Sequence, residues 1–515
     1  MKNIIDLNAE FLRALQLMEE PEGHCLITGR AGTGKSTLLK HFRETTKRKV
    51  VVLAPTGVAA VNVQGQTLHS FFRFRPDVTP ETAVREAKRM AKWDGAKIYR
   101  KIETIIVDEI SMIRADILDC ADLFLQHVRG RQGESFGGVK MIFIGDLYQL
   151  PPVVRSTEKH IFEELYPGIY FFDSNVFRQT SFERIELEKV YRQKDAKFVR
   201  LLNAVRNNSL TEADLKNFNR RYLPDFKMGE ELSITLTAMN EPARNINALK
   251  LKSLKEKSRF YNGETSGDFG NESFPTETRL ELKPKAQVML LNNDSLGRWI
   301  NGTMATVVSL HKDHVQVRLE NGEEEIVEPN TWNLFRYAYD KKKKRLTSET
   351  TGSFTQIPLK LAWAVTIHKS QGKTFDHVVV DVGRGTFATG QMYVALSRCT
   401  SLEGLVLHQR LTKQQVRVDY RIVRFLTGEA YEVSEKKLPL KKKMALIQEA
   451  IDDERIMDVV YLKANDEKSQ RKLRPIEMGE MEYSGKIFLG FRAFCETRKE
   501  ERHFRVDRIL ELKLV

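Results

Sequence analysis

The chain has 515 residues, enough for about three or four domains, and its 41% of apolar residues is ordinary for globular proteins. This composition excludes a disordered or fibrous chain, and the lack of an apolar N-terminal core or of a run near 18 apolar residues argues against a signal peptide or a membrane span, so we expect a cytoplasmic protein. The formal charge of +14, from 83 Lys and Arg against 69 Asp and Glu, suggests either a polyanionic partner or simply a well-solvated surface.

The first elements predict a nucleotide site. Residues 6–20 have apolar side chains at helical spacing with Asn8 as a possible cap, and CLIT at 25–28 is typical of a buried strand. GRAGTGKST follows and fills the pattern G-x-x-x-x-G-K-[ST], in which backbone N–H groups surround phosphates and a lysine reaches the terminal ones. A chance glycine turn is the alternative for this loop alone. The residues expected to bind a nucleoside triphosphate here are Gly29, Ala31, Gly32, Thr33, Gly34, Lys35, Ser36 and Thr37.

Further strands end in polar side chains. The stretch VVVLAPTG at 50–57 is a strand that ends in a turn with Thr56, and Thr67 and His69 follow it, where open α/β sheets bind ligands. His69 taken alone is more typical of a structural histidine. Residues of about 64–100 are a plausible small insertion. The strand at 104–108 ends in Asp108 and Glu109, which could hold magnesium and a water, or could form a solvated acidic turn.

A fourth strand begins at 141 and is followed by Asp146 and Gln149. Four buried strands of this kind predict one doubly wound nucleotide-binding domain over 1–178. The pattern then restarts with IELEKVYRQ, a helix near 200 and strands near 236 and 380. We therefore expect a second α/β domain in two pieces, 179–255 and 358–435.

The two pieces of the second domain are separated by a β-rich insertion over 256–357. It has alternating apolar residues and Asn-Gly pairs that begin at Asn262, Asn301 and Asn321, the signature of hairpins. The run KKKKR at 341–345 is more typical of a solvated loop than of a specific nucleic-acid site. The four cysteines lie far apart without a C-x-x-C pair, which argues against zinc and structural disulfides.

Taken together, these blocks resemble superfamily 1B DNA helicases of the petite-integration-frequency (Pif) type, which are relatives of RecD-like helicases. The resemblance covers residues 1 to about 435 in the order of the family. It implies an α/β fold with two RecA-like P-loop domains, 1A over 1–178 and 2A over 179–255 and 358–435, with an SH3-like insertion, 2B. The matching stretches are GRAGTGKST, LAPTGVAAVNVQGQTLHSFF, VDEISM, FGG, FIGDLYQLPPV, LEKVYRQ, AVTIHKSQGKTFDHVVVD and YVALSRCT.

The resemblance also implies roles at the ATP site. Lys35 would hold the terminal phosphates, and Ser36 and Asp108 would hold magnesium. Glu109 would orient or deprotonate the attacking water, and Gln149 would sense the γ-phosphate. Arg192 and Arg398 would act from the second domain as arginine fingers, which makes hydrolysis depend on closure of the two domains. The expected ATP-binding residues beyond the glycine loop are Gln149, Arg192, Gly372 and Arg398.

Single-stranded DNA is the expected partner of the opposite surface of the cleft. The pattern T-x-H recurs in both lobes, which suits two lobes that bind one strand through its phosphates. Phe71 and Phe72 could stack on bases, but we favour a core position. The expected DNA contacts are Thr56, Thr67, His69, Pro152, Thr366, His368 and Ser370.

Two departures qualify the resemblance. The family has a glutamine in the first helix that reads adenine, and the corresponding position here is Phe11, so adenine selectivity is expected to be weaker or to depend on stacking. The C-terminal stretch 444–515 resembles a β-rich WYL domain, with Tyr461, RKLRPIEM and FRVDRI as its signals. Its namesake triplet is Ile487, Phe488 and Leu489, which leaves a strand plausible and puts the ligand pocket of that family in doubt.

We therefore expect a monomeric ATP- and magnesium-dependent DNA helicase of 5′ to 3′ polarity that acts on tailed or forked duplexes in replication, repair or recombination. A protein partner could bind the WYL-like region. One alternative is an ATP-gated DNA-binding regulator that does not translocate. The complete set of catalytic carboxylates and arginines argues against it. Another is the helicase subunit of a nuclease complex.

Overall fold

The computed structural model describes residues 8–93, 96–154, 162, 164–226, 232–270, 273–340, 345–383, 385–483 and 486–515. The chain forms two compact units. The first comprises Met1–Leu202 and Thr211–Arg417, and the second comprises Asn203–Leu210 and Val418–Val515. Within these described ranges no helix combines the length and the apolar character needed to cross a bilayer.

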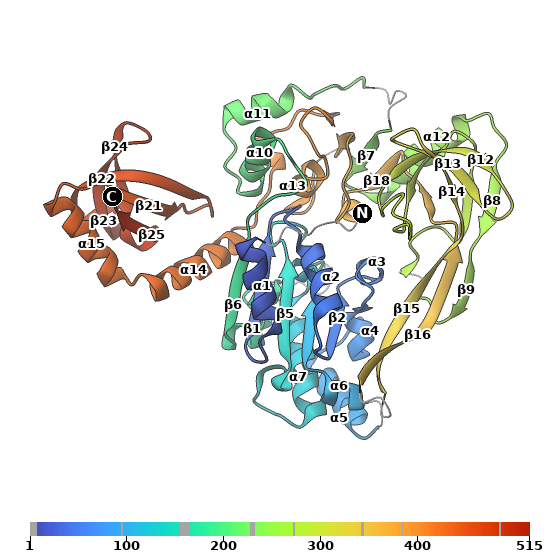
Figure 1. Ribbon diagram of the computed structural model, residues 1–515, viewed down its shortest axis with the longest axis horizontal. Coiled ribbons are helices and arrows are strands. Elements are labelled where there is room, and N and C mark those ends of the chain that lie inside the picture. Colours follow the sequence, from blue (N-terminus) through green and yellow to red (C-terminus); the bar gives the residue numbers. More distant parts are fainter. Residues whose placement is uncertain are drawn as a thin grey trace. The chain divides into compact units, whose positions relative to one another are not determined.

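The first unit begins with a six-stranded parallel sheet of order β3-β2-β4-β5-β1-β6 (Figure 1). The centre of the sheet is covered on both faces, because every residue of β4 and β5 is buried, as expected for parallel strands packed between helices. The strands are β1 (His24–Gly29), β2 (Val50–Ala54), β3 (Gln66–Thr67), β4 (Thr104–Val107), β5 (Lys140–Gly145) and β6 (Phe182–Leu187). The helices are α1 (Ala9–Glu19), α2 (Lys35–Thr45), α3 (Gly57–Asn62), α4 (Leu68–Phe72), α5 (Pro80–Ala91), α6 (Lys97–Lys101), α7 (Ala115–Arg129) and α9 (Asn175–Gln179).

The first helix begins where its cap predicts. The side chain of Asn8 accepts a hydrogen bond from the backbone N–H of Phe11 at 2.8 Å, which satisfies one of the free donors at the helix start. The buried face of α1 carries Phe11, Ala14, Leu17 and Met18, whereas the apolar residue Leu12 is exposed on the other face.

One predicted boundary is wrong. The second α/β domain was expected to begin at residue 179, but β6 pairs in parallel with β1, from His24 beside Phe182 to Gly29 beside Leu187. The strand is therefore an edge of the first sheet. Most of its residues are half-buried, as suits an edge strand, so their composition did not show which sheet they join.

The second sheet of this unit has four parallel strands in the order β18-β7-β19-β20. The strands are β7 (Ile234–Thr237), β18 (Ala364–Thr366), β19 (Val378–Asp381) and β20 (Leu405–Leu407). The helices are α10 (Ala196–Arg206), α11 (Glu212–Asn219), α12 (Asn240–Ser253) and α13 (Gln391–Leu396). Two parallel α/β sheets confirm the predicted fold class. For brevity we call the region of the first sheet the first lobe and that of the second sheet the second lobe.

A β-rich region interrupts the second lobe. Its central sheet has the order β14-β13-β12-β11-β17, and a three-stranded sheet has the order β15-β16-β9 (Figure 1). The insertion reaches Leu361, beyond the predicted end at 357, because β17 pairs with β11. The lysines 341–344 lie outside the described residues. The strands are β8 (Arg259–Asn262), β9 (Glu264–Gly267), β10 (Arg279–Leu282), β11 (Gln287–Leu290), β12 (Met304–Leu310), β13 (Val315–Leu319), β14 (Glu324–Val327), β15 (Asn330–Asp340), β16 (Arg345–Gln356) and β17 (Leu359–Leu361).

The second compact unit contains an antiparallel sheet of order β24-β23-β22-β21-β25. Ile487, Phe488 and Leu489 lie on β23, so the predicted strand at the namesake triplet is confirmed. The longer segment of this unit starts at Val418, before the predicted end of the second α/β domain at 435, because α14 belongs to this unit. Its elements are α14 (Tyr420–Lys437), α15 (Leu440–Asp452), β21 (Met457–Leu462), β22 (Lys468–Tyr483), β23 (Lys486–Cys495), β24 (Glu500–Arg505) and β25 (Ile509–Leu514).

Candidate active site

The glycine loop connects β1 to α2 and is shaped by close packing. A Cβ on Gly29 would lie 2.6 Å from the hydroxyl of Thr33, and a Cβ on Gly32 would lie 2.5 Å from the Cβ of Arg192. Gly32 and Gly34 have φ angles of 82° and 90°, which glycine adopts without strain. The loop therefore leads into the start of an 11-residue helix, a favourable place for an anion.

Lys35 lies on this loop beside the acidic residues. Its Nζ donates to the carbonyl oxygens of Gly29 at 2.7 Å and Arg30 at 2.8 Å. Burial lowers the pKa of Lys35, and the charges of nearby carboxylates, led by Asp146 and Glu109, oppose that shift. Ser36 and Thr37 follow in the first turn of α2 with exposed side chains.

Asp108 and Glu109 come directly after β4. Burial is the main cause that raises the pKa of each carboxyl, and for Glu109 the charge of Asp108 adds to it. Glu109 has φ 52° and ψ 45°, a left-handed conformation that is strained for this residue type and typical of functional sites. The two carboxyls are thus held where their charge is poorly compensated by the protein.

These residues fit a magnesium ion. Carboxylate and hydroxyl oxygens are the donors that magnesium prefers, and Asp108 and Ser36 supply one of each. A divalent cation would also compensate the buried acidic charge that raises the pKa values. No group of three or more His, Cys, Asp or Glu side chains that could hold a metal occurs in the described part of the chain.

A chain of hydrogen bonds joins the acidic residues to the second lobe. Gln371 donates from Nε2 to Oε2 of Glu109 at 3.0 Å and to Oε1 of Gln149 at 3.1 Å. Gln149 in turn donates from Nε2 to Oδ2 of Asp146 at 3.0 Å. Gln371 therefore uses both amide hydrogens on the first lobe, although it lies 262 residues from Glu109 in the sequence. The following residue, Gly372, has φ 79° and open space around it.

Two further contacts bring the lobes together. The hydroxyl of Tyr393 accepts a hydrogen bond at 3.1 Å from the backbone N–H of Ala31 in the glycine loop. Gly390 lies so close to the first lobe that a Cβ there would clash with the carbonyl oxygens of Tyr148 and Gln149. The glycine loop and the Gln149 turn thus both touch the second lobe.

The two predicted arginines lie in different settings. Arg192 was assigned to the second domain, but it follows β6 of the first sheet, and the adjacent Tyr191 N–H donates to the carbonyl of Gly32 at 2.8 Å. Its guanidinium crosses to the second lobe and donates to the carbonyl of Ser397 at 3.2 Å. Arg192 therefore spans the two lobes. Burial lowers its pKa.

Arg398 is fully buried in the second lobe. Its guanidinium donates to the carbonyl oxygens of Val394 at 2.9 Å and Lys373 at 3.2 Å, and to the hydroxyl of Ser397 at 2.9 Å. Burial lowers the pKa of Arg398, and the charge of Arg192 adds to this effect.

Phe11 does not offer a face to a nucleotide base. Its side chain is 3% exposed in the core between α1 and α2, so a base would not stack on Phe11 itself, and the expected weaker adenine selectivity stays a prediction. Tyr191 is an exposed aromatic residue beside the glycine loop. It is 40% exposed, its hydroxyl accepts a hydrogen bond from Asn8 at 3.2 Å, and a Cβ on Gly34 would lie 3.9 Å from its ring.

The residues predicted to bind DNA in the first lobe lie at helix starts. The hydroxyl of Thr56 caps α3 by accepting from the N–H of Ala59, and that of Thr67 caps α4 by accepting from the N–H of Ser70. His69 lies in the first turn of α4 and is half-buried.

The second lobe repeats this arrangement. Thr366 ends β18 and its hydroxyl accepts from the N–H of Lys369 at 3.4 Å, at the 3₁₀ turn His368–Ser370. His368 is half-buried and its ring stacks on Phe387, with the centroids 5.9 Å apart. The hydroxyl of Ser370 is buried and donates to the carbonyl of Ile367. Both T-x-H segments thus form a threonine-capped turn after a strand.

Three other side chains predicted near DNA are buried. Phe71 and Phe72 pack edge to face in the first lobe, which confirms the core interpretation. Pro152 is buried as well, and the exposed apolar residue of this loop is the neighbouring Val153.

Sequence reasoning missed three residues of the site. Gln371 and Tyr393 lie inside stretches that had been singled out, KSQGKT and YVALSRCT, but no local signal indicates their partners in the other lobe. Asp146 had been noted only as a polar residue after a strand, whereas it is 1% exposed and orients Gln149.

Comparisons with known proteins match these regions. Residues 9–216 match the PIF1-like helicase family, 361–406 match the UvrD-like helicase C-terminal domain, and 442–514 match the WYL domain. The chain is 33% identical to the ATP-dependent DNA helicase Pif1 of Bdellovibrio bacteriovorus over 78% of this chain and 88% of that protein. It is also 33% identical to the human ATP-dependent DNA helicase PIF1, over 77% of this chain but only 60% of the human protein.

Solved structures show the same likeness. The crystal structure of Bacteroides sp Pif1 in complex with ADP-AlF4 is 37% identical, has a TM-score of 0.75, and the match covers 83% of this chain and 98% of that one. A second structure, of Bacteroides Pif1 bound to ssDNA, is 36% identical with a TM-score of 0.59 and the same coverage.

Proposed function

The chain belongs to the PIF1-like helicase family, and from this we propose that it is an ATP-dependent DNA helicase that translocates on single-stranded DNA and separates duplexes ahead of it. The observation that supports this most is the amide chain from Asp146 and Gln149 to Gln371 and Glu109, because it connects the hydrolytic acid to a turn expected to bind DNA. The Bacteroides relatives were solved with ADP-AlF4 and with ssDNA, and we assign the same two classes of ligand to this chain.

ATP would bind on the glycine loop. The loop N–H groups and Lys35 would hold its phosphates, and Lys35 would exchange its bonds to the loop carbonyls for bonds to phosphate oxygen. Ser36 and Asp108 would hold magnesium, which when bound supplies positive charge to the phosphate oxygens. Tyr191 offers a ring on which a base can stack.

Glu109 would accept a proton from, or orient, the attacking water, with Gln149 beside it. Arg192 and Arg398 would compensate the charge that develops on the transferred phosphoryl group. Arg398 would have to give up bonds to its own lobe to do so, which couples the chemical step to a rearrangement of the second lobe.

DNA would contact the threonine-capped turns of both lobes. Thr56, Thr67 and His69 in the first lobe and Thr366, His368 and Ser370 in the second would lie along the strand. The threonine hydroxyls accept from backbone N–H groups as caps, so each can still donate its own hydrogen to a phosphate oxygen. Such contacts recognise phosphates and depend on salt rather than on sequence.

The polarity, substrates and pathway are part of the proposal. We propose 5′ to 3′ movement, activity on tailed or forked duplexes in replication, repair or recombination, and a monomeric state. We assign the WYL-like unit, as a hypothesis, to nucleic-acid binding or to a protein partner. Deletion of residues 438–515 tests this, since unchanged DNA affinity and unwinding would leave only the protein partner.

The test of the main proposal is ATP hydrolysis with and without single-stranded DNA, with Lys35→Ala as the inactive control. Strong stimulation by DNA supports a motor, and unwinding of 5′-tailed against 3′-tailed duplexes then decides its polarity. Basal hydrolysis that does not respond to DNA would instead favour the nucleotide-gated regulator.

A further inference from the structure

The loop between β11 and β12, residues 291–303, exposes two large aliphatic side chains. Leu296 is 79% exposed and Ile300 is 67% exposed. Single exposed aliphatic residues are common on protein surfaces and carry no meaning by themselves. Here, however, both belong to one short loop, and that loop is held rigidly.

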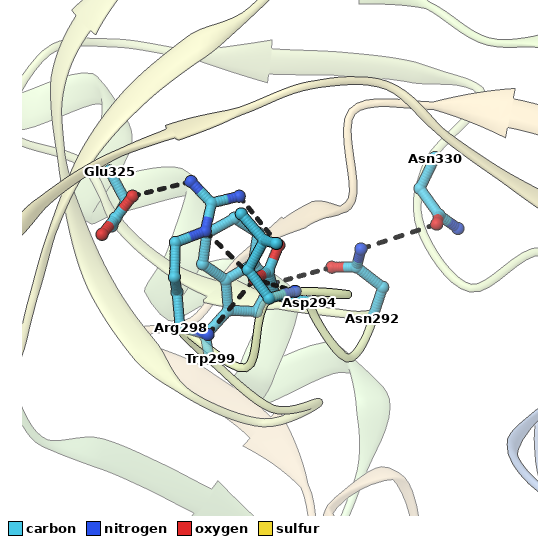
Figure 2. A network of polar contacts seen from close by, with 7 residues as sticks. Asn292, Asp294, Arg298, Trp299, Glu325 and Asn330 are labelled. Atoms are coloured by element: carbon cyan, nitrogen blue, oxygen red, sulfur yellow. Dashed lines mark hydrogen bonds and ion pairs between the residues drawn. The ribbon is translucent and has the colours of Figure 1, made fainter. Parts of the chain in front are cut away.

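The tip of the loop is fixed around the carboxylate of Asp294. It accepts hydrogen bonds from the backbone N–H of Leu296 at 2.9 Å and from the guanidinium of Arg298 at 2.8 and 3.0 Å. Arg298 also donates to Glu325 on β14 at 2.8 Å, as Figure 2 shows. Hydrogen bonds from Arg298 lower the pKa of Asp294 to about 2, so the carboxylate is charged at any working pH.

The base of the loop is fixed by Trp299. Its ring is buried in the core of the inserted β-region, Arg298 lies over it at 4.5 Å, and its indole N–H donates to Asn292 at 3.1 Å (Figure 2). The side-chain amide of Asn292 in turn donates a hydrogen bond to the side-chain oxygen of Asn330. A loop bound at its tip and its base holds Leu296 and Ile300 in place before any partner arrives.

The same loop contacts both lobes beside their proposed DNA turns. Asn301 donates to the side chain of Asn62 at 3.2 Å, and Asn62 ends α3, the helix that Thr56 caps. Asn301 also accepts from Nζ of Lys373 at 2.6 Å, and Lys373 follows the turn His368–Ser370 by three residues. The loop is therefore placed where one strand held by both turns would pass.

Three lysines lie close to one another beside this loop. Lys360 on β17 interacts with Lys369, and its charge also acts on Lys373. Burial and the neighbouring lysines lower the pKa of Lys360 and of Lys373 to about 8. A phosphate chain would relieve this mutual repulsion, so the surroundings of the loop fit a polyanion whose other parts are apolar, and nucleic acid has both properties.

We propose that loop 291–303 is a preformed apolar contact for DNA, in which Leu296 and Ile300 pack against bases of the bound strand where it leaves the duplex, while the neighbouring lysines bind its phosphates. Aliphatic side chains pressed against bases weaken stacking in other DNA-binding proteins. The loop would help to separate strands and would contribute little to hydrolysis. This inference rests on the proposed helicase function.

The test is the double variant Leu296→Ser and Ile300→Ser, with Leu249→Ser as a control because Leu249 is 69% exposed on α12, outside the loop. We expect unwinding of a 5′-tailed duplex to fall roughly tenfold, the size of losing one base contact, while hydrolysis stimulated by single-stranded DNA stays within about twofold. Unchanged unwinding overturns the proposal. An equal loss of stimulated hydrolysis also overturns it, because the loop would then act by positioning the lobes.

The variant Arg298→Ala tests whether the rigidity of the loop matters separately from its contact with DNA. Arg298 is assigned no DNA contact, yet its loss frees the tip, so unwinding should fall as in the double variant. Arg318→Ala is the matched control, because Arg318 forms a similar ion pair with Glu324 on the neighbouring strands. A normal rate for Arg298→Ala would show that the preformed loop does not matter.

The contact itself is tested with a photoreactive p-benzoylphenylalanine in place of Leu296. Crosslinks to the 5′-tailed duplex support the proposal, and crosslinks to protein without any to DNA overturn it. A wild-type chain whose hydrolysis is not stimulated by single-stranded DNA would instead refute the proposed function, so the two failures are distinguishable.

Discussion

Glu109 lies in the first lobe and Arg398 in the second, and the two side chains differ in where their hydrogen-bond partners lie. The carboxylate of Glu109, in the first lobe, accepts a hydrogen bond from Gln371 of the second lobe. The guanidinium of Arg398, in the second lobe, donates to Val394, Lys373 and Ser397 of its own lobe. Burial disfavours the charged form of both groups, raising one pKa and lowering the other.

This difference indicates how each side chain would respond to movement of the second lobe. The acid is already linked to the second lobe, so movement of the Thr366–Ser370 turn reaches it directly through the adjacent Gln371. The arginine must first release bonds inside its lobe.

The largest expected effect is that of Glu109→Gln. The amide cannot accept the proton of water, so turnover should fall by at least about 100-fold while ATP affinity is retained. Nucleotide binding and stimulated hydrolysis are measured side by side. Glu103→Gln, at the other end of the same strand and paired with Lys49 on the surface, is the control and should change either quantity little. Substantial hydrolysis by Glu109→Gln would remove its assigned role.

A smaller effect is expected for Gln371→Ala, which sharpens the comparison between the lobes. Loss of the hydrogen bond to a charged carboxylate is worth roughly 2 kcal/mol, so DNA-stimulated turnover should fall about thirtyfold with little change in basal turnover. Gln316→Ala removes a surface amide that donates to Glu324 and is the control. A parallel fall in both rates would mean that Gln371 acts on the chemistry itself and does not couple it to DNA.

The pH dependence of hydrolysis tests the acid side. Because burial raises the pKa of Glu109, this carboxyl is protonated over a wider acidic range than an ordinary glutamate. Turnover should therefore fall as the pH drops through that raised value, well above the usual pKa of about 4.3. The measurement is kcat/KM for ATP between pH 5 and 9. A profile that stays flat down to pH 5 would contradict the assignment, because an ordinary glutamate would still be charged there.

The smallest effect concerns the base. Phe11 is in the core, and stacking on Tyr191 distinguishes purines poorly, so kcat/KM for ATP and GTP should differ by less than about tenfold. Tyr191→Ala should lower both values together. Use of ATP alone would show that another group reads adenine.

Sequence patterns within short stretches were sufficient to predict most helices, strands and loops. The glycine loop, the strand before Asp108 and the alternating pattern around Asn321 each depend on neighbours in sequence, and the structure has a P-loop, a buried strand and the hairpin β13–β14 there. The order of the motifs also identified the family, because it is read directly along the chain.

What the sequence determined was therefore the chemistry at each strand end and the type of each element. Only the tertiary structure decided that β6 pairs with β1, that α14 joins the C-terminal unit, and that Phe11 faces the core rather than a base. The same holds for Gln371, whose partners lie 222 and 262 residues away. Strand partners, buried faces and long-range hydrogen bonds depend on which segments meet in space, and an apolar or amide side chain carries no local mark of its partner.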